Sequence, residues 1–112
     1  INAACVVARK PLVVGAALRW EGQAIVFDMR RGGPCYACLF PQQGSDDERC
    51  ETAGVLGPVA GVIGVMQAHF ALKLLAGVAV QSGVLHLWDA RGDAWRRLRV
   101  PADPSCPVCA HR

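Results

Sequence analysis

Blocks of apolar residues separated by short polar segments predict a helix followed by two strands at the start of the chain. Residues 2–10 (NAACVVARK) have a helical composition, and Pro11 ends the helix because proline restricts the residue before it. Residues 11–19 form a nearly continuous apolar run, which is typical of a strand buried on both faces. After a turn around Glu21–Gly22, residues 23–28 predict a second strand.

A long apolar helix is predicted over residues 58–76. Pro58 suits its first turn, and Gly77 is placed to stop it. Three glycines recur near its start, and we expect them to allow close packing of the helix backbone; they are Gly57, Gly61 and Gly64. They do not form a phosphate-binding loop, because no Gly-Lys-Ser/Thr follows them.

Residues 84–100 predict a β-hairpin with its turn at residues 91–93. The second strand carries three arginines, Arg96, Arg97 and Arg99. Such a row is typical of a solvated face, and binding of an acidic partner is the alternative. With the two earlier strands in the same sheet and the long helix packed on it, the fold class is α/β.

Composition makes the chain a single apolar domain. Of its 112 residues, 53% are hydrophobic and 19% are charged, the formal net charge is +3, and the mean hydropathy is +0.27. Disorder is excluded, because it requires low hydrophobicity and high net charge. Nucleic-acid binding through charge alone is not expected, because a net charge of +3 over this length makes no dense basic tract. The apolar surplus predicts that part of the surface is covered, by a second subunit or by a missing piece of the same domain.

No membrane helix or signal peptide is expected. The longest stretch without a charge or a histidine covers residues 52–68. It falls just short of the roughly 18 residues of a spanning helix, and Pro58 interrupts it. The chain begins at Ile1 without a basic and apolar leader segment.

Two C-x-x-C pairs carry the main chemical signal. They are Cys35–Cys38 and Cys106–Cys109, and more than half of the chain separates them. Two such knuckles supply four thiolates in a tetrahedral set, the usual arrangement of structural zinc. Iron is the second choice for four sulfurs. The metal would fasten the end of the chain to a loop far upstream.

Two alternatives to a metal site stay open at this point. The six cysteines could form a disulfide framework, although no secretory segment is visible. A thioredoxin-like redox pair is the other alternative, but that chemistry needs one C-x-x-C at a strand-to-helix turn. The three histidines are scattered and are not needed as ligands; they are His69, His86 and His111.

The two remaining cysteines differ in context. Cys5 lies on the apolar first helix and is expected to be an inert buried thiol. Cys50 follows the polar segment 42–49, and the neighbouring Arg49 would favour its thiolate. The residues alone leave open whether Cys50 is reactive or structural.

Several segments in order resemble the MoeB/ThiF/HesA family, the bacterial relatives of ubiquitin-activating enzymes. The matching segments are residues 31–41 (RGGPCYACLFP), 50–64 (CETAGVLGPVAGVIG), 67–77 (QAHFALKLLAG) and 103–109 (DPSCPVC), and residues 2–27 fit the family's helix–strand–strand order. The resemblance therefore covers practically the whole chain.

The resemblance implies a fold and an activity. The fold would be the C-terminal half of a Rossmann-like ubiquitin-activating-enzyme fold, with a mixed sheet, a packed helix and a four-cysteine zinc knuckle. Such enzymes use ATP and Mg²⁺ to adenylate the C-terminal Gly-Gly of a ubiquitin-like sulfur-carrier protein, and sulfur transfer follows, in molybdopterin or thiamine biosynthesis. They are cytoplasmic and commonly dimeric, which makes a homodimer the expectation.

The family's residues carry over one by one. Its zinc ligands match Cys35, Cys38, Cys106 and Cys109, and its loop cysteine matches Cys50. In the thiamine branch that loop cysteine takes part in covalent sulfur chemistry with the carrier, so Cys50 is the candidate catalytic residue. One departure is Phe70, where the family usually has glutamate, which affects any polar contact from that helix face.

The second departure concerns nucleotide binding. The family's glycine-rich loop, its ATP-contacting side chains and its metal-binding aspartate lie upstream of the segment that matches Ile1. No G-x-G-x-x-G occurs in the chain. We therefore expect residues 1–112 to be the carrier-binding, zinc-containing part of a single adenylating domain, inactive by itself. The rival hypothesis is a non-catalytic zinc-ribbon module that binds a protein partner through its arginines, but a simple ribbon would not require Cys50 and residues 52–54.

Overall fold

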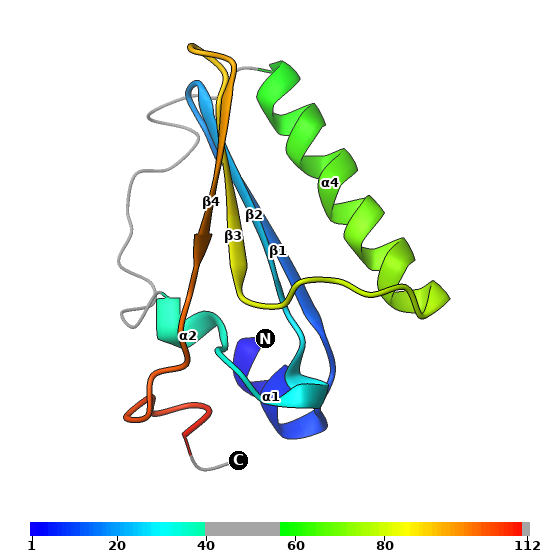
Figure 1. Cartoon of the computed structure of the whole chain (residues 1–112), viewed down its shortest axis with the longest axis vertical. Coiled ribbons are helices and arrows are strands. Elements are labelled where there is room, and N and C mark those ends of the chain that lie inside the picture. Colours follow the sequence, from blue (N-terminus) through cyan, green and yellow to red (C-terminus); the bar gives the residue numbers. More distant parts are fainter. Residues whose placement is uncertain (40–56, 111–112) are drawn as a thin grey trace.

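The computed structural model describes residues 1–39 and 57–110, which form a four-stranded sheet with helices on both faces (Figure 1). In chain order the elements are α1 (Asn2–Ala8), β1 (Leu12–Leu18), β2 (Glu21–Phe27), the 3₁₀ turn η1 (Met29–Arg31), α2 (Tyr36–Leu39), α4 (Gly57–Ala76), β3 (Val84–Asp89) and β4 (Ala94–Arg99). The predicted order of helix, two strands, long helix and hairpin is confirmed.

The strands lie in the order β1-β2-β3-β4, and every pairing is antiparallel. The sheet therefore consists of two hairpins joined through the β2–β3 pair, with α4 in the connection. The predicted sheet and its hairpin turn are confirmed. Asp89 Oδ1 accepts from the backbone N–H of Arg91 at 3.0 Å in that turn. Parallel strands, which a mixed sheet would include, are not among the described residues.

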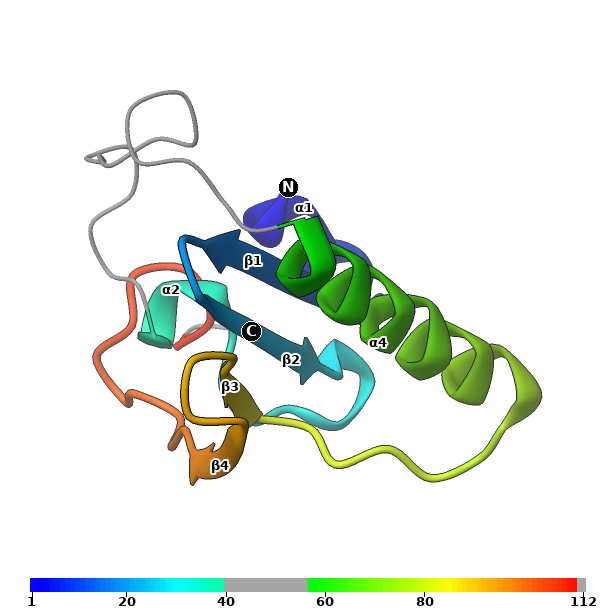
Figure 2. The ribbon, with the colours of Figure 1, turned by 90° about the horizontal axis from the view of Figure 1, so that it is seen from above.

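Helix α4 covers one face of the sheet, over β1 and β2 (Figure 2). The close approach depends on Gly22, because a Cβ built there would lie 2.5 Å from Ile63 Cγ1 and 3.2 Å from Val59 Cγ1. Ala24 and Val26 continue the same face of β2 and complete a small core with this side of the helix. Small residues on β2 thus let the helix lie directly on the strand.

The opposite face carries the larger core, at the end of the sheet where α1 and α2 lie. Ile25 and Phe27 of β2 point into it together with Leu85 of β3, and Val6 of α1 closes it. All four cysteines of the C-x-x-C pairs pack within or against this cluster. The candidate metal site is therefore part of the main hydrophobic core.

Two expectations about the first strands were wrong. Strand β1 is half-buried along most of its length instead of buried on both faces, because it has a neighbouring strand on only one side within the described residues. Strand β2 is the buried one. The turn lies at Arg19–Trp20, where Arg19 has φ 58°, and not at Glu21–Gly22, which begin β2. The first helix also ends at Ala8, before the expected Lys10.

The expectation that the α4 glycines pack closely was also wrong. A Cβ built on Gly57, Gly61 or Gly64 would meet nothing within 4 Å in the described part of the chain. The exposed side of α4 is nevertheless apolar, with Val65 71%, Leu72 65% and Leu75 85% exposed. By contrast, Gly77 stops the helix as expected, with a φ of 76° that suits glycine.

By length and composition, α4 could cross a membrane, with a mean hydropathy of 1.6 over its most apolar window. Core helices of folded domains share this length and composition. Here α4 packs along a sheet face through Val59, Ile63 and Phe70, so its inner side belongs to a folded domain.

Candidate metal centre

The first cysteine pair lies in a tight turn after η1. Gly32 and Gly33 have φ of 76° and 83°, conformations that favour glycine, and Pro34 follows them. Cys35 comes next, and the backbone N–H of Cys38 donates to its carbonyl at 2.9 Å. The Gly-Gly-Pro sequence therefore turns the chain so that the thiols of Cys35, just before α2, and Cys38, within α2, face the same side.

The second pair lies in a turn after β4. The backbone N–H of Val100 donates to Gly83 O at 2.7 Å, which fixes the point where the chain leaves the sheet. The carboxylate of Asp103 accepts from the backbone N–H of Ser105 at 2.9 Å. The backbone carbonyl of Asp103 accepts from the backbone N–H of Cys106 at 3.0 Å. The N–H of Asp103 also lies 3.4 Å from Cys38 Sγ. This knuckle therefore contacts the first one directly.

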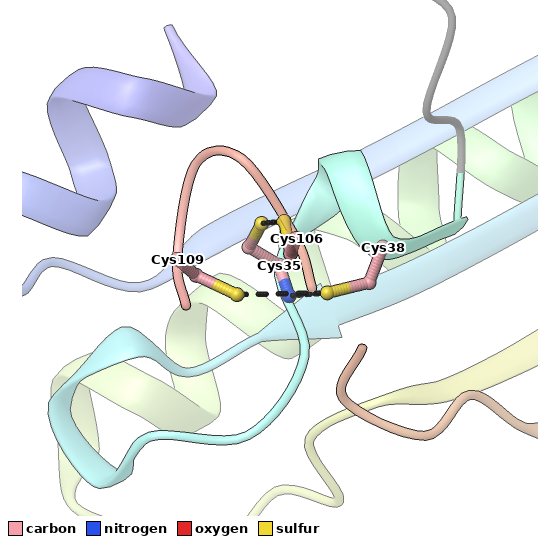
Figure 3. A group of neighbouring side chains, drawn as sticks. All are labelled: Cys35, Cys38, Cys106 and Cys109. Carbon is pink, nitrogen blue, oxygen red and sulfur yellow. Dashed lines mark hydrogen bonds between the residues drawn. The ribbon is translucent and has the colours of Figure 1, made fainter. Parts of the chain in front are cut away.

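The four sulfurs converge on one point (Figure 3). All lie within 4.8 Å of one another, Cys35 Sγ is 3.7 Å from Cys106 Sγ, and Cys38 Sγ is 3.5 Å from Cys109 Sγ. Four sulfurs bound tetrahedrally at about 2.3 Å from a metal would be separated by roughly 3.8 Å, so the spacing fits. All four are free thiols, which argues against the disulfide framework.

The protein environment of the cluster favours ionisation at one sulfur and resists it at another. Burial raises the pKa of Cys106, but hydrogen bonds from the backbone of Cys109 and Val108 and from the side chains of Cys109 and Cys35 together outweigh burial and hold it at about 7. Burial, with hydrogen bonds to the neighbouring thiols, raises the pKa of Cys109 to about 12. Four close thiols cannot all ionise without a cation between them, so this donor set suits a divalent metal.

The other candidate residues lie elsewhere. Cys50 falls in residues 40–56, outside the described part of the chain. Cys5 is half-buried at the edge of the main core, so it is less protected than expected. Arg96, Arg97 and Arg99 are exposed, as expected of a solvated face.

His69, His86 and Phe70 stay outside the cluster, and His111 lies outside the described residues. Within residues 1–39 and 57–110 the one group that could hold a metal consists of cysteines alone. Phe70 is buried between α4 and the sheet, with its ring centroid 5.3 Å from that of His86. This helix position therefore makes an apolar contact here, where the family's glutamate would be polar.

One residue of the site was not foreseen. Asn2, the first residue of α1, is 7% exposed, and its side-chain amide lies against the first cysteine knuckle. An asparagine at a helix start looks like a local capping residue, and nothing in the sequence says that it contacts a residue 33 positions away.

Comparison with known proteins gives consistent matches. A model of the ThiF family matches residues 1–108. The chain is 42% identical over 109 residues to the sulfur carrier protein ThiS adenylyltransferase of Escherichia coli K12, and it is 44% identical over 110 residues to the molybdopterin-synthase adenylyltransferase of the same strain. Each alignment covers 97% of this chain but only 43% and 44% of the respective relative.

Solved structures show the same fold. The E. coli MccB structure with ATP has a TM-score of 0.73 at 18% identity, covering 97% of this chain and 35% of that one. The structure of MccB, described as the microcin C7 biosynthetic enzyme, in complex with N-formylated MccA has a TM-score of 0.75 at 14% identity, covering 96% and 36%. The chain thus spans less than half the length of the relatives that it matches.

Proposed function

The chain belongs to the ThiF family, and from that premise we propose that it is the C-terminal part of an ATP-dependent adenylyltransferase acting on a ubiquitin-like sulfur-carrier protein. The observation that carries the proposal is the identity above 40%, over nearly all of the chain, to two adenylyltransferases. One of them is named for the carrier ThiS and the other for molybdopterin synthase. The pathway would accordingly be thiamine or molybdopterin biosynthesis.

We propose that the metal is zinc, held by Cys35, Cys38, Cys106 and Cys109. Four thiolates in a closed tetrahedral set are typical of structural zinc, and no position is left open for a water or a substrate. The metal would therefore not act on the carrier directly. It would hold together two turns that come from distant parts of the chain and pack in the same core cluster.

The position of the metal centre gives it a second effect. Helix α2 follows Cys35 and ends at Leu39, and α4 begins at Gly57, so the metal centre and the sheet-packed helix hold the two ends of the segment that contains Cys50 (Figure 1). We propose that Cys50 takes part in thiol chemistry with the carrier, as the family resemblance implies. The metal would then serve that chemistry by fixing where the segment starts.

The nucleotide site is proposed to lie outside residues 1–112. In this family ATP, bound with Mg²⁺, donates the adenylate group and releases pyrophosphate, and the residues that would hold the nucleotide have no counterpart in this chain. The domain assignment is therefore a carrier-binding, zinc-containing part of one adenylating domain, and this part alone would be inactive. The sheet and α4 would supply its scaffold.

We also propose a homodimer in the cytoplasm. The exposed apolar side of α4, with Val65, Leu72 and Leu75, requires a cover in a soluble protein. A second subunit or the rest of a longer protein would supply one. The resemblance implies both the dimer and the compartment.

Carrier-dependent exchange of pyrophosphate into ATP tests the proposed function. The intact protein should catalyse the exchange with a ubiquitin-like carrier that ends in Gly-Gly, and a carrier without its last two residues is the matched control. Exchange with the first carrier and none with the second supports the proposal. Tight carrier binding without any exchange would favour the non-catalytic binding module.

A further inference from the structure

Asn2 is an unusual side chain to find buried. Only Asn2 and Asp28 are polar residues buried in the described part of the chain. Burial of a side-chain amide is unfavourable unless its donor and acceptor are both satisfied. The helix that Asn2 begins does not use it, since its N-terminal cap is Ile1 and no side chain makes a capping hydrogen bond. The amide of Asn2 therefore has another role.

Both ends of that amide contact the first cysteine knuckle. The backbone N–H of Tyr36 donates to Asn2 Oδ1 at 3.0 Å, and Asn2 Nδ2 lies 3.5 Å from Cys35 Sγ, within the distance for a hydrogen bond to sulfur. One contact fixes the backbone at Tyr36, and the other fixes the sulfur of Cys35. Since Asn2 belongs to α1, it also ties that helix to the knuckle.

A hydrogen-bond donor at this sulfur has a direct effect on metal binding. Four thiolates bring a charge of −4 to a divalent ion, and N–H groups that donate to the sulfurs stabilise the excess negative charge. The backbone already serves two other sulfurs in this way, with Asp103 N at Cys38 and the N–H groups of Val108 and Cys109 at Cys106. Asn2 is the side chain that does so at Cys35.

We propose that Asn2 is a positioning residue of the metal centre, which acts through Cys35. It holds Cys35 Sγ in the direction of the other three sulfurs and places a hydrogen-bond donor on it. Groups that orient a metal ligand typically change metal affinity by roughly 10- to 100-fold when they are removed. The role is independent of the carrier and of ATP.

Cobalt substitution of the purified protein tests this role. Asn2→Ala should weaken Co²⁺ binding at least about tenfold in competition with a chromogenic chelator, and the sulfur-to-cobalt absorption bands should shift because one thiolate loses its donor. Asn2→Asp keeps the size of the side chain and the acceptor for Tyr36 N–H but removes the donor. It should also weaken binding, and it covers the case in which Asn2→Ala fails to fold.

Val6→Ala is the matched control. Val6 is buried on the same helix and in the same core, but it offers no hydrogen bond to the knuckle. It should lower the free energy of unfolding while leaving the cobalt affinity and spectrum unchanged. Unchanged affinity and spectrum in both Asn2 variants would overturn the proposal. So would a loss of affinity in Val6→Ala as large as in Asn2→Ala, or failure of the unsubstituted protein to bind cobalt.

Discussion

Removing the metal should cost the fold about 4 kcal/mol through the chain connection alone. The metal links cysteines that are 71 residues apart in the sequence, Cys35 to Cys106 and Cys38 to Cys109. A cross-link that closes a loop of this length reduces the entropy of the unfolded chain by an amount worth about 4 kcal/mol. For a domain near 100 residues, that corresponds to a fall in the melting temperature of roughly 15–30 °C.

The assay is urea unfolding of the purified protein with and without a strong chelator, with metal content measured in both samples. Adding zinc back should restore the original free energy of unfolding. Cys106→Ser together with Cys109→Ser should lower that free energy by a similar amount and remove the chelator's effect. The control is Cys5→Ala, outside the cluster, which should leave the response to the chelator unchanged. If the chelator strips the metal and stability falls by less than about 1 kcal/mol, the cross-link reasoning is wrong.

Three further predictions concern other parts of the chain. Gly22→Ala should lower the free energy of unfolding by about 1–3 kcal/mol, because the new Cβ would overlap Ile63. The loss of stability should be smaller when Ile63→Ala is already present, and equal losses with and without Ile63→Ala would contradict the packing described. In the metal-loaded protein, a mild alkylating agent should label Cys50 before any of the four clustered cysteines, as followed by peptide mass mapping, and the reverse order would refute its assignment as the reactive thiol. Burial and the nearby charge of Arg97 lower the pKa of His86 in the folded protein. As the pH falls below about 6.5, His86 is therefore protonated in the unfolded chain before it is protonated in the folded one, which favours unfolding. Stability should therefore decline less steeply between about pH 7 and 5.5 in His86→Leu than in the unsubstituted protein, and identical slopes would count against that shift.

The sequence predicts an element well where single residues that restrict the backbone mark its ends. Pro58 and Gly77 mark the two ends of α4 because each residue restricts the backbone near it. Each C-x-x-C pair lies in a tight turn, as its spacing predicts, with Cys38 N–H donating to Cys35 O and Ala110 N–H donating to Cys106 O. These features need only a few neighbouring residues to be specified.

Features that depend on distant neighbours could not be predicted in this way. The apolar run of β1 resembles a strand buried on both faces, but burial depends on which strands pair with it, and β1 has one partner in the described chain. The glycines Gly61 and Gly64 lie on the outer side of α4 because the register of the helix on β2 is fixed by the gap at Gly22. The contact of Asn2 with Cys35 depends on how α1 packs against the knuckle, which no local pattern encodes.

X-ray absorption at the zinc edge, together with metal content, tests the central claim most directly. The claim is that Cys35, Cys38, Cys106 and Cys109 together bind one zinc ion in the main core of the fold. The protein should contain about one zinc per chain, with four sulfur ligands at roughly 2.3 Å and no nitrogen or oxygen ligand. Zinc with fewer than four sulfur ligands, or disulfides among these four cysteines in the freshly purified protein, would contradict it.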